Sequence, residues 1–315
     1  MEQEQRNPFM GIIDVGQAEK LFDEYRIQNP KDTDGQLRVL SELLDALFAA
    51  EEQLTGDADD FHNFAVTVSR VANDNKDAYA VVREGLKIHD INTDLLADAL
   101  MYGANAGEKA ECEKWYGVLQ RVDKSKWTWR AFSFTITYLL NLYASSESGG
   151  TTIDDILSLA HEYQKNLPDD ESAWISLYRV YDRINQRAKG MEVLEDAIKK
   201  FQSCPKCWLR YADAMLEDGF YEKAEPIIRK MLRDPNTTEH VNTSYMYFLD
   251  GKCKMARLMD SDAYWDGEVD EKEVKKIYRS FVLARRLEGL RENVNQRIED
   301  YVNRLSFETG IPYEG

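Results

Sequence analysis

Residues 171–204 read ESAWISLYRVYDRINQRAKGMEVLEDAIKKFQSC, and residues 205–238 read PKCWLRYADAMLEDGFYEKAEPIIRKMLRDPNTT. The two segments are equal in length and align without a gap, so that Trp174 lies over Trp208. The same shift pairs Leu177 with Tyr211, Tyr178 with Ala212, Tyr181 with Met215, Gly190 with Ala224, Leu194 with Ile228 and Ala197 with Met231. A period of about 34 residues is typical of a repeat built from two helices. We therefore predict an all-α fold of stacked antiparallel helix pairs.

The two segments resemble the tetratricopeptide repeat (TPR) family, whose units follow the pattern W-x2-L-G-x2-Y, then A-x3-F, then a Pro near the end. The matching residues are Trp174, Leu177 and Tyr181 in the first segment, and Trp208, Ala212, Ala224 and Pro235 in the second. The resemblance implies a right-handed superhelix, an α-solenoid, in which the first helix of each pair displays residues to a protein or peptide partner.

Two positions of the first segment depart from the TPR pattern. Small residues at the eighth and twentieth positions of a unit let its two helices approach closely, and the second segment has Ala212 and Ala224 there. The first segment has Tyr178 at the eighth position and Gly190 at the twentieth. Because Tyr178 is large, it weakens the case for close packing of the two helices in this unit.

Weaker signals extend the repeats toward the amino terminus. A shift of 32 residues aligns Ala72-Asn73 with Ala104-Asn105 and Gly85 with Gly117, and each copy is typical of a helix, a short polar turn and a second helix. Residues 126–146 and 153–166 predict another helix pair across the loop 147–151. We assign residues 57–238 to TPR-like repeats, which are clearest over 171–238.

Helical periodicity continues on both sides of this region. Residues 15–28 and 37–54 carry apolar residues at steps of three and four, which predicts an acidic helical hairpin within residues 1–56. Residues 239–315 are expected to form C-terminal helices that cap the array, one over 240–260 and one long charged helix over 271–307.

Charge and composition restrict the classes of partner. The chain has 57 Asp and Glu against 40 Lys and Arg, a net charge of −17. Tight binding of nucleic acid or of an anionic membrane needs basic surface, so neither is expected, and a basic partner is favoured. No window of 18 apolar residues and no secretory signal is present, which predicts a cytoplasmic protein without a membrane insertion.

Candidate partner-binding residues come from the phase of the first helices and from aromatic clusters. Tyr and Arg are the side chains that most often carry interface energy. The candidates are Tyr178, Arg179, Arg183, Arg210, Trp127 and Trp129.

Residues 262–273 imitate a calcium-binding loop. Oxygen ligands stand at its first, fifth, ninth and twelfth places, with Gly267 at the sixth and an apolar residue at the eighth. The four candidate ligands are Asp262, Asp266, Asp270 and Glu273. Tyr264 occupies the third place, where a carboxylate or amide is usual, so a solvated acidic linker is favoured and a single weak calcium site is the alternative.

No other motif nominates a catalytic, metal or cofactor site. Cys204 and Cys207 form a CxxC between the two clear repeats, but no second CxxC or paired histidine supplies the remaining zinc ligands. Phosphate-binding loops and nucleophile motifs are absent from the sequence. We predict a non-catalytic adaptor or scaffold that binds a protein or peptide and needs no cofactor. The alternative is a regulatory subunit that responds to a signalling peptide or to calcium.

Overall fold

The computed structural model describes residues 7–145, 151–287, 290 and 292–313, with the side chains of 238–240 left out. Over these residues the regular elements are helices, accompanied by one isolated β-bridge between Asp14 and Thr55. The predicted all-α fold is confirmed. The chain divides into two compact units, Met1–Ser176 and Leu177–Gly315.

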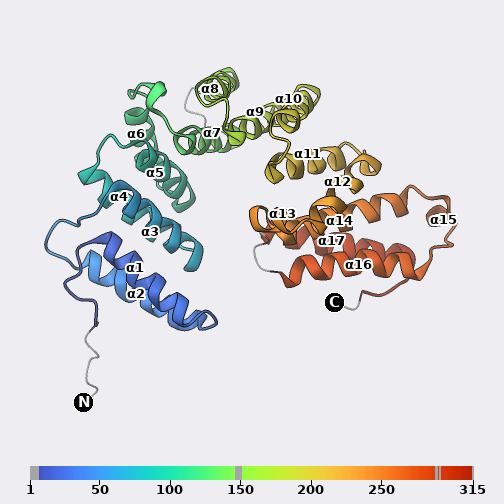
Figure 1. Ribbon diagram of the computed structural model, residues 1–315, viewed down its shortest axis with the longest axis horizontal. Helices are drawn as coiled ribbons and strands as arrows, with labels where there is room; N and C mark the ends of the chain where they lie inside the picture. Colours follow the sequence, from blue (N-terminus) through green and yellow to red (C-terminus); the bar gives the residue numbers. More distant parts are fainter. Residues whose placement is uncertain (1–6, 146–150, 288–289, 291, 314–315) are drawn as a thin grey trace, which may run out of the picture. The chain divides into compact units, whose positions relative to one another are not determined.

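Unit 1 consists of successive helix pairs (Figure 1). The pairs are α1 (Val15–Gln28) with α2 (Thr33–Phe48), α3 (Ala58–Val71) with α4 (Asn75–Ile88), α5 (Thr93–Ala106) with α6 (Lys109–Leu119), and α7 (Trp129–Ala144) with α8 (Ile153–Asn166). A 3-10 turn, Lys124–Lys126, precedes α7. Connections this short join antiparallel neighbours. The predicted loop 147–151 lies outside the described residues except for Thr151.

Unit 2 continues the pairs and ends in longer helices. Its elements are α10 (Arg187–Lys200), α11 (Pro205–Glu217), α12 (Tyr221–Arg233), α13 (Pro235–His240), α14 (Thr243–Met259), α15 (Asp262–Trp265), α16 (Glu271–Arg286) and α17 (Glu292–Thr309). Helix α9 (Glu171–Arg183) contains the division between the units at Ser176 and Leu177. This division therefore falls inside the predicted repeat segment 57–238, while residue 56 lies between α2 and α3.

Left-handed turn residues reveal the register of the repeat where sequence identity does not. The turns within four of the pairs contain Asn73, Gly107, Asn185 and Gly219, each with a positive φ. The interval from Asn73 to Gly107 equals the interval from Asn185 to Gly219, which is the period of the two clear repeats. Because Asn and Gly both tolerate this conformation, the turn recurs without residue identity. The upstream units thus have the same period as the clear ones, and the shorter shift predicted for them was wrong.

In the α9–α10 pair the Tyr178 side chain lies against Gly190, the two unusual positions of this unit. Tyr178 is buried, and a Cβ added to Gly190 would lie 3.1 Å from Cδ2 of Tyr178. In the α11–α12 pair the corresponding Ala212 and Ala224 are both fully buried. One large and one absent side chain thus replace two small ones, and the Tyr178 ring fills the space between the two helices.

The predicted long helix over 271–307 is in fact two helices, α16 and α17. The Phe281 ring in α16 and the Tyr301 ring in α17 stack with a centroid distance of 6.0 Å, and both pack on Phe248 of α14. An unbroken helix rises about 1.5 Å per residue and would carry its second half away from α14. The break lets both apolar faces reach one core.

Candidate ligand-binding site

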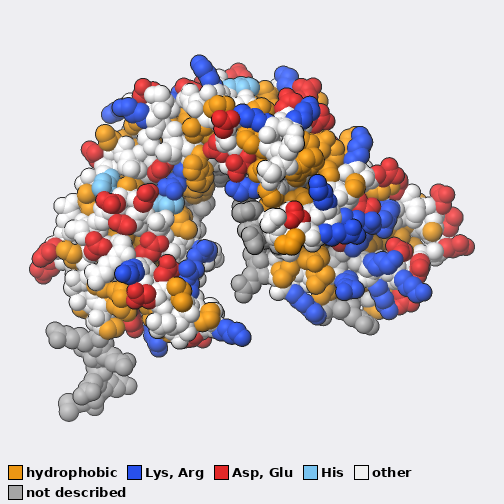
Figure 2. Space-filling view, in the orientation of Figure 1, with side chains coloured by type: hydrophobic (Ala, Val, Ile, Leu, Met, Phe, Trp, Pro, Cys, Tyr) orange, Lys and Arg blue, Asp and Glu red, His pale blue; other side chains and the backbone are white. Residues whose placement is uncertain are grey.

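A cluster of charged and aromatic side chains lies on α11, α14 and α17 of unit 2. We call it the α11–α14–α17 cluster, and it comprises Arg210, Asp213, Glu217, Tyr245, Lys252 and Arg297. Figure 2 shows Lys and Arg side chains gathered over unit 2 on the viewed face.

Asp213 is the buried centre of one half of this cluster, with 8 % of its surface exposed. Its Oδ2 accepts hydrogen bonds from the Tyr245 hydroxyl at 2.8 Å and from the Arg210 guanidinium at 3.3 Å. Burial first, and the Asp213 carboxylate second, raise the pKa of Tyr245. Charged hydrogen bonds offset the cost of burying this carboxylate and fix the Arg210 side chain in place.

Glu217 is the centre of the other half. Lys252 Nζ donates to its Oε1 at 2.5 Å and Arg297 donates to the same oxygen at 3.2 Å. Burial alone would raise the pKa of Glu217, but the hydrogen bonds from Lys252 and Arg297 outweigh it and lower that pKa. Both cations also lie over the Phe248 ring, 5.6 Å and 5.4 Å from its centroid. Arg297 is thereby held on the same face as Arg210.

A pocket of about 340 Å³ opens beside this cluster, between α11 and the first turns of α14 and α17. We call it the polar pocket. Its lining consists of Arg210, Asn242, Tyr245, Leu290, Asn293, Val294 and Arg297. A guanidinium has five N–H donors in a planar fork that matches a carboxylate, and an amide side chain both donates and accepts. The pocket can therefore hold an anionic group together with peptide backbone.

The structure brings together only some of the residues that the sequence nominated in unit 2. Arg210 lies in the cluster, and Tyr178 lies near it, since Asp213 and Arg210 both act on the Tyr178 hydroxyl. Burial is the main reason that the pKa of Tyr178 rises to about 12. Tyr178 is thus a core residue; Arg179 is half-buried and Arg183 is exposed on α9.

The two nominated tryptophans belong to unit 1. Trp127 is buried against Phe132, with ring centroids 5.1 Å apart, and also lines a pocket of about 870 Å³ between α6, α7 and α8. Trp129 is 47 % exposed, and the Arg130 guanidinium lies 5.6 Å from its ring. Of the two, only Trp129 is exposed to solvent.

Sequence reasoning missed most of the polar pocket. Asn242, Tyr245, Asn293 and Arg297 lie beyond the clear repeats, in the segment predicted to be a cap. Their one sequence signal is that Asn242 begins a helix, where its side chain accepts from the backbone of Tyr245. The unexpected break before α17 is what places Asn293 and Arg297 at the pocket.

Unit 1 carries an acidic cluster made by Glu19 and Asp23 of α1 and Asp60 of α3. Burial, then Asp23 and Asp60, raise the pKa of Glu19 to about 7. Nearby, the His62 ring nitrogen Nδ1 lies 2.7 Å from Oδ2 of Asp98, a fully buried carboxylate. Asp23 also pairs with Arg26 at 2.9 Å, and Asp60 accepts a hydrogen bond from the backbone N–H of Asp57, so both carboxylates have partners within the chain.

The candidate calcium ligands are not assembled around one point. Asp262 begins the short helix α15, Asp266 follows it, and Asp270 accepts from the backbone of Lys272 at the start of α16. Glu273 pairs with Lys276 at 2.5 Å. Over the described part of the chain, no three His, Cys, Asp or Glu side chains gather closely enough to hold a metal ion. The calcium site stays a prediction without geometric support.

The two cysteines of the CxxC motif lie at the start of α11. Cys207 is buried within this helix, and the half-buried Cys204 is the residue before it. Among the described helices, none combines the length and apolar character needed to cross a membrane.

Comparison with known proteins supports the fold. No family model matches this chain, and no curated protein matches it. A solved tetratricopeptide repeat protein from Parabacteroides merdae aligns with 90 % of this chain and 99 % of its own, with a TM-score of 0.58 and 15 % identity. A structure of a human IFIT1 dimer with m7Gppp-AAAA aligns over 96 % of this chain and 66 % of its own, with a TM-score of 0.52 and 14 % identity.

The class of protein follows from the helix pairs and these similarities: the chain has a TPR-like helical repeat fold. At 14–15 % identity the similarity concerns the fold alone. The resemblance drawn from residues 171–238 therefore extends structurally over most of the chain.

Proposed function

We propose that this chain is a non-catalytic adaptor whose polar pocket binds an acidic side chain or the terminal carboxylate of a protein or peptide partner. The observation that carries the proposal is the convergence of Arg210 and Arg297, from helices α11 and α17, on one pocket with two amide side chains. Such arrays are generally used for binding, because stacked helix pairs present an extended surface.

Pre-organisation supports the pocket as a binding site. Arg210 is held by Asp213, and Arg297 is held by Glu217 and stacks over Phe248. Fixed side chains lose less conformational entropy when a ligand binds. Each guanidinium retains further N–H donors for a ligand, because the bonds to Asp213 and Glu217 do not use all five.

The net acidity of the chain supports a partner that also carries basic residues. The net charge of −17 would attract such residues over a range set by ionic strength. A cytoplasmic location and a partner with both signs of charge are parts of the proposal. The regulatory alternative, with calcium at residues 262–273, requires a site that the described side chains do not assemble.

A display library of peptides with free carboxyl termini tests the proposal. Binders selected on the wild type are measured against the double variant Arg210→Ala/Arg297→Ala and against Arg285→Ala as control. Arg285 lies on α16, away from the pocket, and pairs only with Glu299 among the contacts of its guanidinium with the described residues. We expect a loss of affinity of about tenfold or more in the double variant, no change in the control, and acidic or carboxylate groups in the selected peptides.

Two outcomes would contradict the proposal. One is a set of binders whose affinity is the same in the double variant. The other is tight, Arg210- and Arg297-dependent binding of a capped RNA oligonucleotide, the ligand type named for the human IFIT1 structure. The net charge of −17 disfavours RNA, since phosphate binding needs basic surface.

A further inference from the structure

Two hollows lie side by side along α12, on surface that the polar pocket does not use. One is about 450 Å³ and is lined by α12 and the residue that follows it; the other is about 660 Å³ and reaches the start of α11. They share Pro226, Lys230 and Asp234, so they form one depression. We call it the α12 groove.

The floor of the α12 groove is apolar. Trp208 of α11 and Pro226, Ile227 and Met231 of α12 line its larger hollow. The indole N–H of Trp208 donates to the Gln202 carbonyl at 2.9 Å, which fixes the ring at the edge of the groove. The volume of the larger hollow falls within the range of known ligand pockets, whose walls are mostly apolar. The hollow is therefore large enough to take a large side chain.

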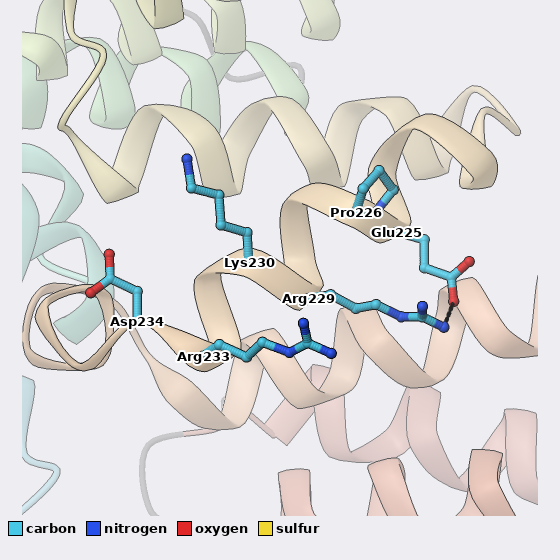
Figure 3. Close-up of a pocket in the computed structure, with 6 residues that line it drawn as sticks. All are labelled: Glu225, Pro226, Arg229, Lys230, Arg233 and Asp234. Carbon is cyan, nitrogen blue, oxygen red and sulfur yellow. Dashed lines mark hydrogen bonds and ion pairs between the residues drawn. The ribbon is translucent and has the colours of Figure 1, made fainter.

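The rim of the groove is cationic (Figure 3). Arg229, Lys230 and Arg233 project from α12, and Arg229 pairs with Glu225 at 2.6 Å. Glu225 also pairs with Arg257, at 3.0 Å. The Asp234 side chain accepts a hydrogen bond from the backbone N–H of Asn236. Glu225 is therefore neutralised by two cations, whereas Asp234 caps α13 and keeps its charge at the end of the groove.

Lys230 and Arg233 are exposed and make no ion pair with the described residues. Two unpaired cations next to an apolar surface are unusual on a chain whose net charge is −17. Their charge is complementary to an acidic ligand, and the floor is complementary to an apolar one.

We propose that the α12 groove is a second docking site, which binds an acidic peptide segment through one large apolar residue. The apolar residue packs on Trp208, Ile227 and Met231, and the flanking carboxylates pair with Lys230 and Arg233. The α12 groove shares no lining residue with the polar pocket, so this proposal does not depend on the function proposed for that pocket.

Fluorescence anisotropy with three labelled peptides tests this site. The first peptide is a run of Glu and Asp with one central Phe; the second has Ser in place of Phe; the third has Lys in place of the acids. All carry an amidated carboxyl terminus, which removes one group that would select the polar pocket. We expect only the first to bind well, because the second lacks the apolar anchor and the third meets like charge.

Substitutions in the α12 groove test whether the first peptide binds there. Lys230→Glu/Arg233→Glu should weaken binding of the first peptide by at least about tenfold. Lys223→Glu is the matched control, an exposed charge reversal on the same helix outside the groove. Because the polar pocket is proposed to take acidic side chains as well, all peptides and charge reversals are compared in the Arg210→Ala/Arg297→Ala background, where the α12 groove is the remaining proposed site. Thermal melting followed by circular dichroism confirms that each variant is folded.

Three results would overturn the proposal. Equal affinity of the Phe and Ser peptides would show charge attraction without an anchor. Unchanged affinity in Lys230→Glu/Arg233→Glu would place the peptide elsewhere. A concentration-dependent dimer, seen by analytical ultracentrifugation and lost in the same variant, would make a second copy of the chain the occupant instead.

Discussion

Tyr178 of α9 packs against Gly190 of α10, where a Cβ would lie 3.1 Å from the tyrosine ring. The TPR pattern has a small residue at each of these positions, and here one has become large and the other has lost its side chain. The two substitutions compensate each other, so the helices remain in contact. The pair makes a direct test of packing in this unit.

Gly190→Ala should destabilise the protein. Overpacking costs about 1–3 kcal/mol, partly offset by about 1 kcal/mol of improved helix propensity. Gly117→Ala is the matched control, since nothing lies within 4 Å of its added Cβ. In urea unfolding, the control should have a higher free energy of unfolding than the wild type. The free energy of unfolding of Gly190→Ala should lie about 1–3 kcal/mol below that of the control. Equal stability of the two variants would show that Tyr178 can move aside.

Gly251→Ala should have a larger effect. A Cβ at this position of α14 would lie 2.5 Å from Cε1 of Phe281 in α16, a ring in the core of unit 2. The ring is fully buried and also packs on Phe248, so relief requires the helices to separate. We expect a loss of about 3 kcal/mol in the free energy of unfolding. A loss smaller than that of Gly190→Ala would contradict this order.

Tyr245→Phe should weaken unit 2 by about 1 kcal/mol, because it leaves the buried Asp213 with one hydrogen bond fewer. Tyr247→Phe, on the same helix, is the control, since no hydrogen bond of its hydroxyl to the described residues is found. Chemical unfolding compares the two variants. A Tyr245→Phe variant as stable as the control would mean that Arg210 alone satisfies Asp213.

Glu19 should make the protein less stable as pH rises from about 4.5 to about 7. Its pKa is about 7 in the folded chain and 4.5 as the ordinary value, so the folded state favours the protonated form. The ionised carboxylate beside Asp23 and Asp60 then opposes folding above pH 7. After allowance for its partial exposure, Glu19→Gln should gain about 1 kcal/mol at pH 8.

At pH 4, below both pKa values, the Glu19→Gln variant and the wild type should have the same stability. Unfolding curves at the two pH values provide the measurement. A gain that is equal at both would point to a cause other than ionisation.

Calcium should produce no heat in a calorimetric titration at millimolar concentration. Asp270 is engaged with the first turn of α16, and Glu273 is paired with Lys276. Heat that disappears in Asp262→Asn/Asp266→Asn would restore the calcium loop and the regulatory alternative.

Much of the fold could be predicted from the sequence because local signals carry it. The repeat period and the helical spacing of apolar residues identified the pairs over 171–238, and α1 begins and ends where its periodicity predicts. The upstream register was missed since a left-handed turn accepts either Asn73 or Gly107, and sequence identity does not record backbone conformation.

The candidate sites were largely beyond sequence reasoning. Arg210 was nominated from helix phase, but Arg179 and Arg183 share that phase and lie outside the polar pocket. Tyr178 and Trp127 were nominated as aromatic surface and are buried. Helical phase gives the direction of a side chain but not the neighbour that covers it.

By itself the sequence determined an acidic, all-helical repeat chain, because periodicity, turn residues and net charge are properties of short segments. Only the tertiary structure decided that the helix predicted over 271–307 breaks and places Arg297 beside Arg210. It also decided that Glu225 is occupied by Arg229 and Arg257 while Lys230 and Arg233 remain available. Both outcomes depend on contacts between residues distant in the chain, and such contacts leave no local pattern.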